Sequence, residues 1–152
     1  METQFTFIGT SWHSLDEKGR LALPGKMRDE LQESESPEEV VIYPDPDGGF
    51  LCLYPIEQWR KVLMAVENIE DYEERMEAKG HYAGTSEPIK VDKSGRLVIS
   101  ASLRAEVGLE KEVGIRGGVS KIEIWNPDKL RLKAEKEKAA AKEKRKSWNL
   151  PL

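Results

Sequence analysis

Hydrophobic and polar residues alternate in two separate stretches of the chain, and a tight turn follows each one. Residues 13–15 and 89–91 come before the turns and show the period of two that half-buried strands have. Residues 21–23 and 97–99 come after the turns and are apolar throughout. The pattern therefore predicts a strand, a turn and a second strand at both places.

The two turns, residues 16–20 and 92–96, begin nearly the same phrase. The first reads DEKGRLALPGKMR and the second DKSGRLVISASLR. Aspartate at the start of a turn can accept backbone N–H bonds, and glycine near its end permits a positive φ. A second arginine recurs further along both phrases, as Arg28 and Arg104.

Each turn leads into a short helix and then a β-hairpin. Pro24 suits the start of the first helix, whereas Ser100 stands at the same place in the second copy and can cap it. Turn residues at 45–49 and 117–120 separate paired apolar stretches, which is typical of hairpins. The chain is therefore an internal duplication of a unit of about 50 residues.

Two longer helices are expected after the units. Apolar side chains recur at helical spacing along residues 56–79, and we expect Gly80 to end that helix. The segment that begins at Pro127 carries AEKEKAAAKEKRK, a strong helix former with weak amphipathicity. The predicted organisation is a first unit at 5–55, a linking helix at 56–80, a second unit at 81–127, and a basic C-terminal helix and tail at 128–152.

Composition indicates a folded protein with a large solvated surface. Apolar residues make up 38% of the chain and charged residues 34%. No apolar run approaches the ~20 residues that span a bilayer, and the start lacks the features of a secretory signal. The lone Cys52 cannot form an internal disulfide framework. We expect a soluble cytoplasmic protein without a membrane contact.

Charge is unevenly distributed along the chain, although its net value is −4. Residues 129–146 are strongly basic, while acidic residues gather at 33–39 and 67–77. Such asymmetry marks either a contact with nucleic acid or another acidic partner, or an ordinary solvated helix. For the tail alone the solvated helix is the simpler interpretation.

Catalytic chemistry finds little support in the sequence. One cysteine and two histidines give no zinc spacing, and no nucleophile or phosphate-loop motif is present. His13 has Ile89 as its counterpart, which favours a partly buried side chain over an acid or base, and Cys52 fits a small core residue. Asp16 and Asp92 each have a local role in a turn. We expect neither an enzyme nor a bound metal or cofactor.

The arginine in each turn has two interpretations. Arg20 and Arg96 can form exposed ion pairs with the aspartates four residues earlier, worth at most about 1 kcal/mol. Alternatively, a rigid hairpin presents each arginine to an anion, where its planar fork can hold a phosphate or read guanine. Lys18 or Lys93 stands beside each arginine. The recurrence of two arginines in both copies favours function.

Two D-x-x-G-R phrases at this spacing resemble one known family. H-S-L-D-E-K-G-R-L-A-L-P, preceded by F-I-G, is similar to the first half of the bacterial MraZ proteins. I-K-V-D-K-S-G-R-L-V-I, followed by K-I-E-I-W, is similar to their second half. The resemblance covers residues 5 to 130, in the same order and at the same spacing.

The resemblance implies an α+β fold of the AbrB type. In it, two tandem swapped-hairpin units form an intertwined β-barrel pseudo-dimer, with a long linking helix and a C-terminal helix. It also implies a nucleoid-associated regulator of the division and cell-wall gene cluster. Such regulators bind short direct repeats of double-stranded DNA in their own promoter region, as homo-oligomeric closed rings.

The family's D-x-x-x-R motif falls on both turns, and Arg20 is the stronger candidate for DNA contact. The full set of DNA-binding candidates is Asp16, Lys18, Arg20, Arg28, Asp92, Lys93, Arg96 and Arg104. Ser100 and Ser94 depart from the family pattern and from the first unit, which weakens the expectation for the second turn. The rival hypothesis is a non-enzymatic oligomeric protein-interaction module whose basic tail contacts a protein.

Overall fold

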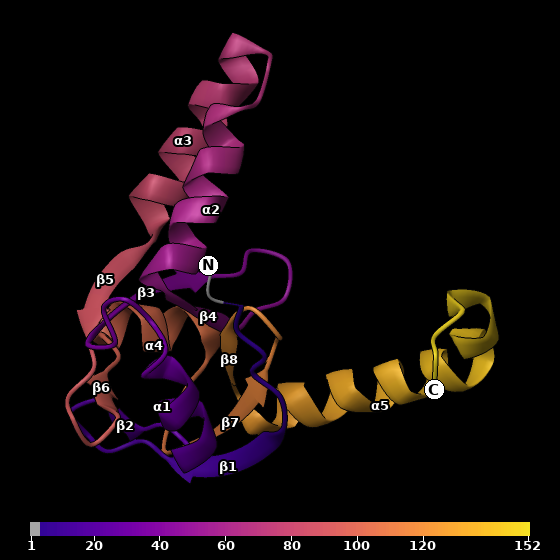
Figure 1. Ribbon diagram of the computed structural model, residues 1–152. Coiled ribbons are helices and arrows are strands. Elements are labelled where there is room, and N and C mark those ends of the chain that lie inside the picture. The colour runs from indigo at the N-terminus through magenta and orange to yellow at the C-terminus, as the bar shows by residue number, and fades with distance from the viewer. Residues whose placement is uncertain (1–3) are drawn as a thin grey trace.

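The computed structural model describes residues 4–152, and its elements repeat once along the chain (Figure 1). The first unit contains β1 (Thr10–Ser14), β2 (Arg20–Ala22), α1 (Gly25–Leu31), β3 (Glu39–Pro44) and β4 (Leu51–Pro55). The second contains β5 (Glu87–Lys90), β6 (Arg96–Val98), α4 (Ala101–Val107), β7 (Glu112–Gly117) and β8 (Ile122–Trp125). The duplicated order of strand, turn, strand, helix and hairpin is confirmed.

The strands form a six-stranded antiparallel sheet in the order β1-β7-β8-β4-β3-β5. β1 pairs with β7, and β5 pairs with β3, so the first strand of each unit lies beside the hairpin of the other unit. β4 and β8 join the two hairpins in the middle. The short strands β2 and β6 pair with each other as a separate two-stranded ribbon. Every layer of the fold therefore contains strands from both units.

The sheet is open, so the expected closed barrel is wrong. β1 and β5 lie at its two edges. At their ends the Leu15 N–H donates to the Lys111 carbonyl at 2.7 Å, and the Val91 N–H donates to the Glu38 carbonyl at 2.8 Å. The chain then turns away into the ribbon. A closed barrel would require β1 to pair with β5. Both strands instead end in turns, and β2 and β6, which follow those turns, pair with each other.

The main core lies between the sheet, the ribbon and the two short helices. Leu21 and Leu97 are the middle residues of β2 and β6, and both are buried in this core. Met27 and Leu103 enter it from α1 and α4. Burial of each such side chain contributes about 1.5–3 kcal/mol. The inward leucines thus hold the ribbon against the body and leave its other face outside.

The single helix expected over residues 56–80 is wrong, because the chain forms a helical hairpin there. α2 (Ile56–Glu67) and α3 (Tyr72–Thr85) project from the body side by side (Figure 1). Asp71 caps α3 by accepting from the Glu74 N–H at 2.9 Å, and Gly80 lies inside α3 rather than at its end. The base of the hairpin packs on a separate cluster around Trp59 and Tyr43.

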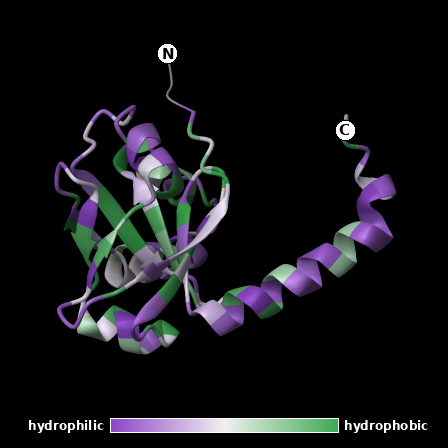
Figure 2. Ribbon diagram, turned by 90° about the horizontal axis from the view of Figure 1, so that it is seen from below, coloured by the Kyte–Doolittle hydropathy of each residue, from purple (hydrophilic) through white to green (hydrophobic). Residues whose placement is uncertain are grey.

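The C-terminal helix α5 (Pro127–Lys144) and the 3-10 helix Arg145–Trp148 confirm the helical reading of the tail. Near the start of α5, Leu130 is buried, and the Arg131 guanidinium lies 4.5 Å from the centre of the Trp12 ring. Further along, Glu137 of α5 pairs with Arg116 of β7 at 2.5 Å. Beyond this contact the helix leaves the body as a largely hydrophilic arm (Figure 2). Along residues 4–152, no helix has the length and apolar character needed to cross a membrane.

Candidate nucleic-acid interface

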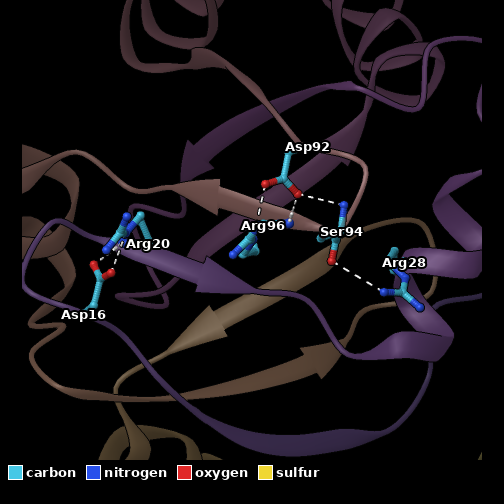
Figure 3. A network of polar contacts seen from close by, with 6 residues as sticks. All are labelled: Asp16, Arg20, Arg28, Asp92, Ser94 and Arg96. Carbon is cyan, nitrogen blue, oxygen red and sulfur yellow. Dashed lines mark hydrogen bonds and ion pairs between the residues drawn. The ribbon is translucent and has the colours of Figure 1, made fainter.

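The first turn, residues 16–20, is built around one carboxylate. Asp16 Oδ1 accepts from the backbone N–H groups of Lys18 at 2.9 Å and Arg20 at 2.8 Å. Asp16 Oδ2 binds Arg20 Nε at 2.5 Å (Figure 3). The ion pair therefore uses the inner nitrogen of the guanidinium, and the two terminal nitrogens lie beyond it.

The second turn, residues 92–96, repeats this arrangement. Asp92 Oδ1 accepts from the backbone N–H groups of Ser94 and Arg96, both at 2.9 Å. The bond from Arg96 Nε to Asp92 Oδ2 is longer, at 3.3 Å (Figure 3). The sequence-predicted pairing of aspartate and arginine is thus present in both turns, and it is looser in the second.

The hydrogen bonds in each turn lower the pKa of its aspartate. The Arg20 backbone N–H has the largest effect on Asp16, followed by the Arg20 side chain, and the pKa of Asp16 lies below its ordinary value. The Arg96 backbone N–H does most to lower the pKa of Asp92. Both carboxylates are therefore ionised at neutral pH and orient the arginines that follow them.

The outward face of the ribbon carries both arginines. Arg20 lies opposite Val98, and Ala22 lies opposite Arg96. These residues flank the buried middle positions of β2 and β6, and all four are exposed. Arg20 and Arg96 are therefore diagonal neighbours on one face, where Cα atoms lie about 7–8 Å apart. Their side chains are 58% and 62% exposed.

The arginines of the two short helices lie behind the turns. Arg28 donates through Nη1 to the Ser94 carbonyl at 3.5 Å (Figure 3). Its stem packs against Gly95. Arg104 donates through Nε to the Ile99 carbonyl at 3.0 Å and lies against Gly19. Each of these arginines therefore contacts the turn of the opposite unit, an arrangement that the sequence alone did not reveal.

The remaining candidates lie on the rim of the same region. Lys18 and Lys93 are exposed inside the two turns. The ribbon and the ends of β1 and β5 line an open hollow of about 1050 Å³ that includes Glu38 and Lys90. The structure therefore brings all eight predicted residues to the ribbon or to its immediate support. Ala22 and Val98 also belong to this face, although they were not among the predicted residues. The alternation of side chains along a strand could have placed them beside Arg20 and Arg96.

Other chemistry-bearing residues have structural surroundings. Cys52 is buried, and desolvation raises the pKa of its thiol to about 12, which confirms a core role. His13 is partly buried and shares a hydrogen bond of 2.7 Å with the Ser11 hydroxyl. Within residues 4–152, no group of three or more potential ligands is placed to hold a metal ion.

One family of proteins is similar to this chain along most of its length. The family model described as "MraZ protein, putative antitoxin-like" matches residues 6–79 and 82–147. Its curated relatives include a "Transcriptional regulator MraZ" of Lachnoclostridium phytofermentans, 33% identical over 123 residues, which cover 81% of this chain and 83% of that one. The protein of the same name from Pseudoalteromonas translucida is 36% identical over 79% of both chains. That from Nitrosomonas europaea is 35% identical over 85% and 86%.

Proposed function

The chain belongs to the MraZ family of transcriptional regulators, and we propose that it regulates transcription by binding double-stranded DNA through the outward face of the β2–β6 ribbon. Membership confirms the expectation of a regulator rather than an enzyme. We further propose that the target is a set of short direct repeats in its own promoter region, within the division and cell-wall gene cluster, and that the protein works in the cytoplasm at the nucleoid.

The placement of Arg20 and Arg96 is the observation that carries this proposal. The major groove of B-DNA admits a two-stranded β-ribbon, and an arginine fork can bind guanine O6 and N7 together. Asp16 and Asp92 bind the inner nitrogens of the two forks, which leaves the terminal nitrogens of two exposed side chains for a base contact. In this proposal Lys18 and Lys93 bind phosphates, whereas Arg28 and Arg104 hold the turns in place from behind.

Assembly supplies the affinity that one ribbon lacks. Two lysines neutralise few phosphates and two arginines read few bases, so a single chain binds DNA weakly. A closed ring of head-to-tail copies presents the same ribbon at regular intervals, and direct repeats at the matching interval engage several ribbons at once. We therefore propose a ring of chains, each an intertwined pseudo-dimer of the swapped-hairpin class.

Substitution of the ribbon arginines tests this function. We expect Arg20→Ala to reduce affinity for DNA upstream of the protein's own gene by about 5-fold or more, because a good bidentate base contact contributes about 1–3 kcal/mol per site. The looser pair at Arg96 is expected to give a smaller loss. Fluorescence anisotropy at matched salt measures both. Arg60→Ala is the matched control, since Arg60 is also an exposed arginine paired with a carboxylate, that of Glu35.

Salt and mass measurements complete the test. Binding of wild type should weaken steeply with added salt, in proportion to the phosphates contacted. The mass of each variant in solution should equal that of the wild-type oligomer, because the arginines lie on the outward face. Equal binding of Arg20→Ala and wild type to the upstream DNA would refute the assignment of the ribbon.

The exposed end of α5 is the observation that favours the rival function, a protein-interaction module. Trp148 and Leu150 are exposed beyond a basic helical arm, which is a surface that a protein partner could cover. Removal of residues 133–152 should leave the sequence preference for DNA intact if the ribbon is the reader. Loss of all partner binding from that deletion alone would instead support a protein-interaction module.

A further inference from the structure

Val98 is an exposed aliphatic residue on the proposed DNA surface. It is 52% exposed, whereas its neighbours Leu97 and Ile99 are buried in the core. It lies directly opposite Arg20 in the ribbon, so the two side chains stand side by side on the outward face. A side chain that faces outward beside a reading arginine is positioned to contact what the arginine contacts.

The base-pair edges of the major groove offer one apolar group to such a side chain. That group is the C5 methyl of thymine, which is absent from the other three bases. We infer that Val98 reads a thymine methyl next to the base that Arg20 contacts. This inference rests on the proposed function and deepens it, because it adds a specificity-determining residue to the arginine motif.

The two halves of the ribbon differ at this position. Arg96 lies opposite Ala22, whose single methyl reaches less far than the branched side chain of Val98. The methyl contact is therefore stronger beside Arg20 than beside Arg96. Valine also suits a strand, so a test must separate strand propensity from contact. Val98→Thr does this, since threonine keeps the β-branch and replaces one methyl with a hydroxyl.

DNA without thymine methyls gives a direct probe. Amplifying the upstream DNA with deoxyuridine in place of thymidine removes every such methyl outside the primers and keeps the base pairing. Wild type should bind this DNA at least about fourfold more weakly than unmodified DNA, the factor expected for one buried methyl-sized group. Val98→Ala should lose most of this fourfold difference, and Val98→Thr, which keeps one of the two methyls, should lose part of it. Ala22→Val should increase it.

Controls separate the contact from general effects of the substitution in the DNA. Met64→Ala removes an exposed apolar side chain on α2, away from the ribbon, and should keep the wild-type ratio. Thermal unfolding should show that both Val98 variants remain folded. If both Val98 variants bound unmodified and deoxyuridine DNA with the same ratio of affinities as wild type, the inference would be overturned while the proposed function stood. Absence of Arg20-dependent binding to unmodified DNA would overturn the proposed function, and the inference with it.

Discussion

The two turn glycines illustrate how equivalent residues acquire different surroundings. Gly19 has φ +81 and Gly95 has φ +78, so both need the left-handed region that glycine adopts readily. A Cβ on Gly19 would lie 2.3 Å from the Ile99 carbonyl oxygen, which is backbone. A Cβ on Gly95 would meet the side chain of Arg28 at 2.7 Å, and that flexible stem can move. The same substitution therefore has different consequences in the two turns.

We expect Gly95→Ala to lower the free energy of unfolding by about 1–3 kcal/mol, the range for a residue held in a sparsely populated backbone conformation. Gly19→Ala should lower the free energy of unfolding by about 1–3 kcal/mol more than Gly95→Ala does, because the backbone carbonyl of Ile99 cannot move away as a flexible side chain can. Urea denaturation measures both. Gly80→Ala is the control, since its Cβ would meet nothing within 4 Å and it should be neutral or stabilising. Equal losses at the two turns would contradict the assigned contacts.

The lowered pKa values of Asp16 and Asp92 give a pH dependence with a definite sign. A depressed pKa in the folded state stabilises the protein above the unfolded pKa, and this contribution disappears as the pH falls through the folded value. The difference in stability between wild type and Asp16→Asn should therefore be present at neutral pH and vanish in acid. Carboxyl carbon NMR titration should show both aspartates titrating below 3.8. Titration at that ordinary value would remove the basis for this expectation.

At the scale of elements, two different residues start equivalent helices. Pro24 precedes α1 with φ −55, and Ser100 precedes α4 with φ −59. The Ser100 hydroxyl accepts from the Leu103 N–H at 3.3 Å, a cap that proline cannot make. Proline instead restricts the unfolded chain. The two copies therefore stabilise the same helix start by different physical means.

Substitutions at Ser100 separate these two means. Ser100→Ala should cost about 1 kcal/mol through loss of the cap. Ser100→Pro also loses the cap, but the nearly identical φ of Pro24 shows that proline fits, and the reduced freedom of the unfolded chain restores about 0.4–1 kcal/mol. Proline should therefore be the milder substitution in thermal unfolding. A larger loss with proline than with alanine would show that the two helix starts are not equivalent.

The repeat, the turns and both hairpins could be predicted from the sequence, because turn residues and apolar periods are local signals. The helical break could not. Ile69, Tyr72 and Met76 continue the apolar stripe of residues 56–79 across the loop, so the period gave no sign of a reversal. The available signal was Asp71 with Glu74 three residues later, which is a helix-start pattern. Local sequence patterns are compatible with strands that pair within one unit and with strands that pair between the two units. The pairing between units could therefore be predicted only from the family resemblance.

At the scale of the whole molecule, the loop between α2 and α3 separates the two units in sequence, although their strands are interleaved. β1 needs β7 from the second unit, and β5 needs β3 from the first. The loop itself lies at the far end of the projecting helical hairpin (Figure 1). The covalent connection between the halves is therefore remote from the contacts that fold them.

Division of the chain in this loop should yield two fragments that fold only together. We expect fragments 1–69 and 70–152 to be unfolded as separate monomers, because each exposes a sheet edge and half of the core. Mixing them should restore cooperative unfolding in circular dichroism and a 1:1 complex in gel filtration. Cooperative unfolding of fragment 1–69 as a monomer would show that the first unit has a core of its own.

The covalent joining of two similar halves gives the ribbon a polarity. A reader made of two identical chains has an exact two-fold axis, and such a reader binds a DNA site equally well in both directions. Here one end of the ribbon offers Arg20 beside Val98 and Lys18, while the other end offers Arg96 beside Ala22 and Ser94. Under the proposed function, each chain can thus distinguish upstream from downstream along the duplex. On direct repeats, which all point the same way, such a reader binds every site in the same orientation. A symmetric reader would bind each site in either orientation.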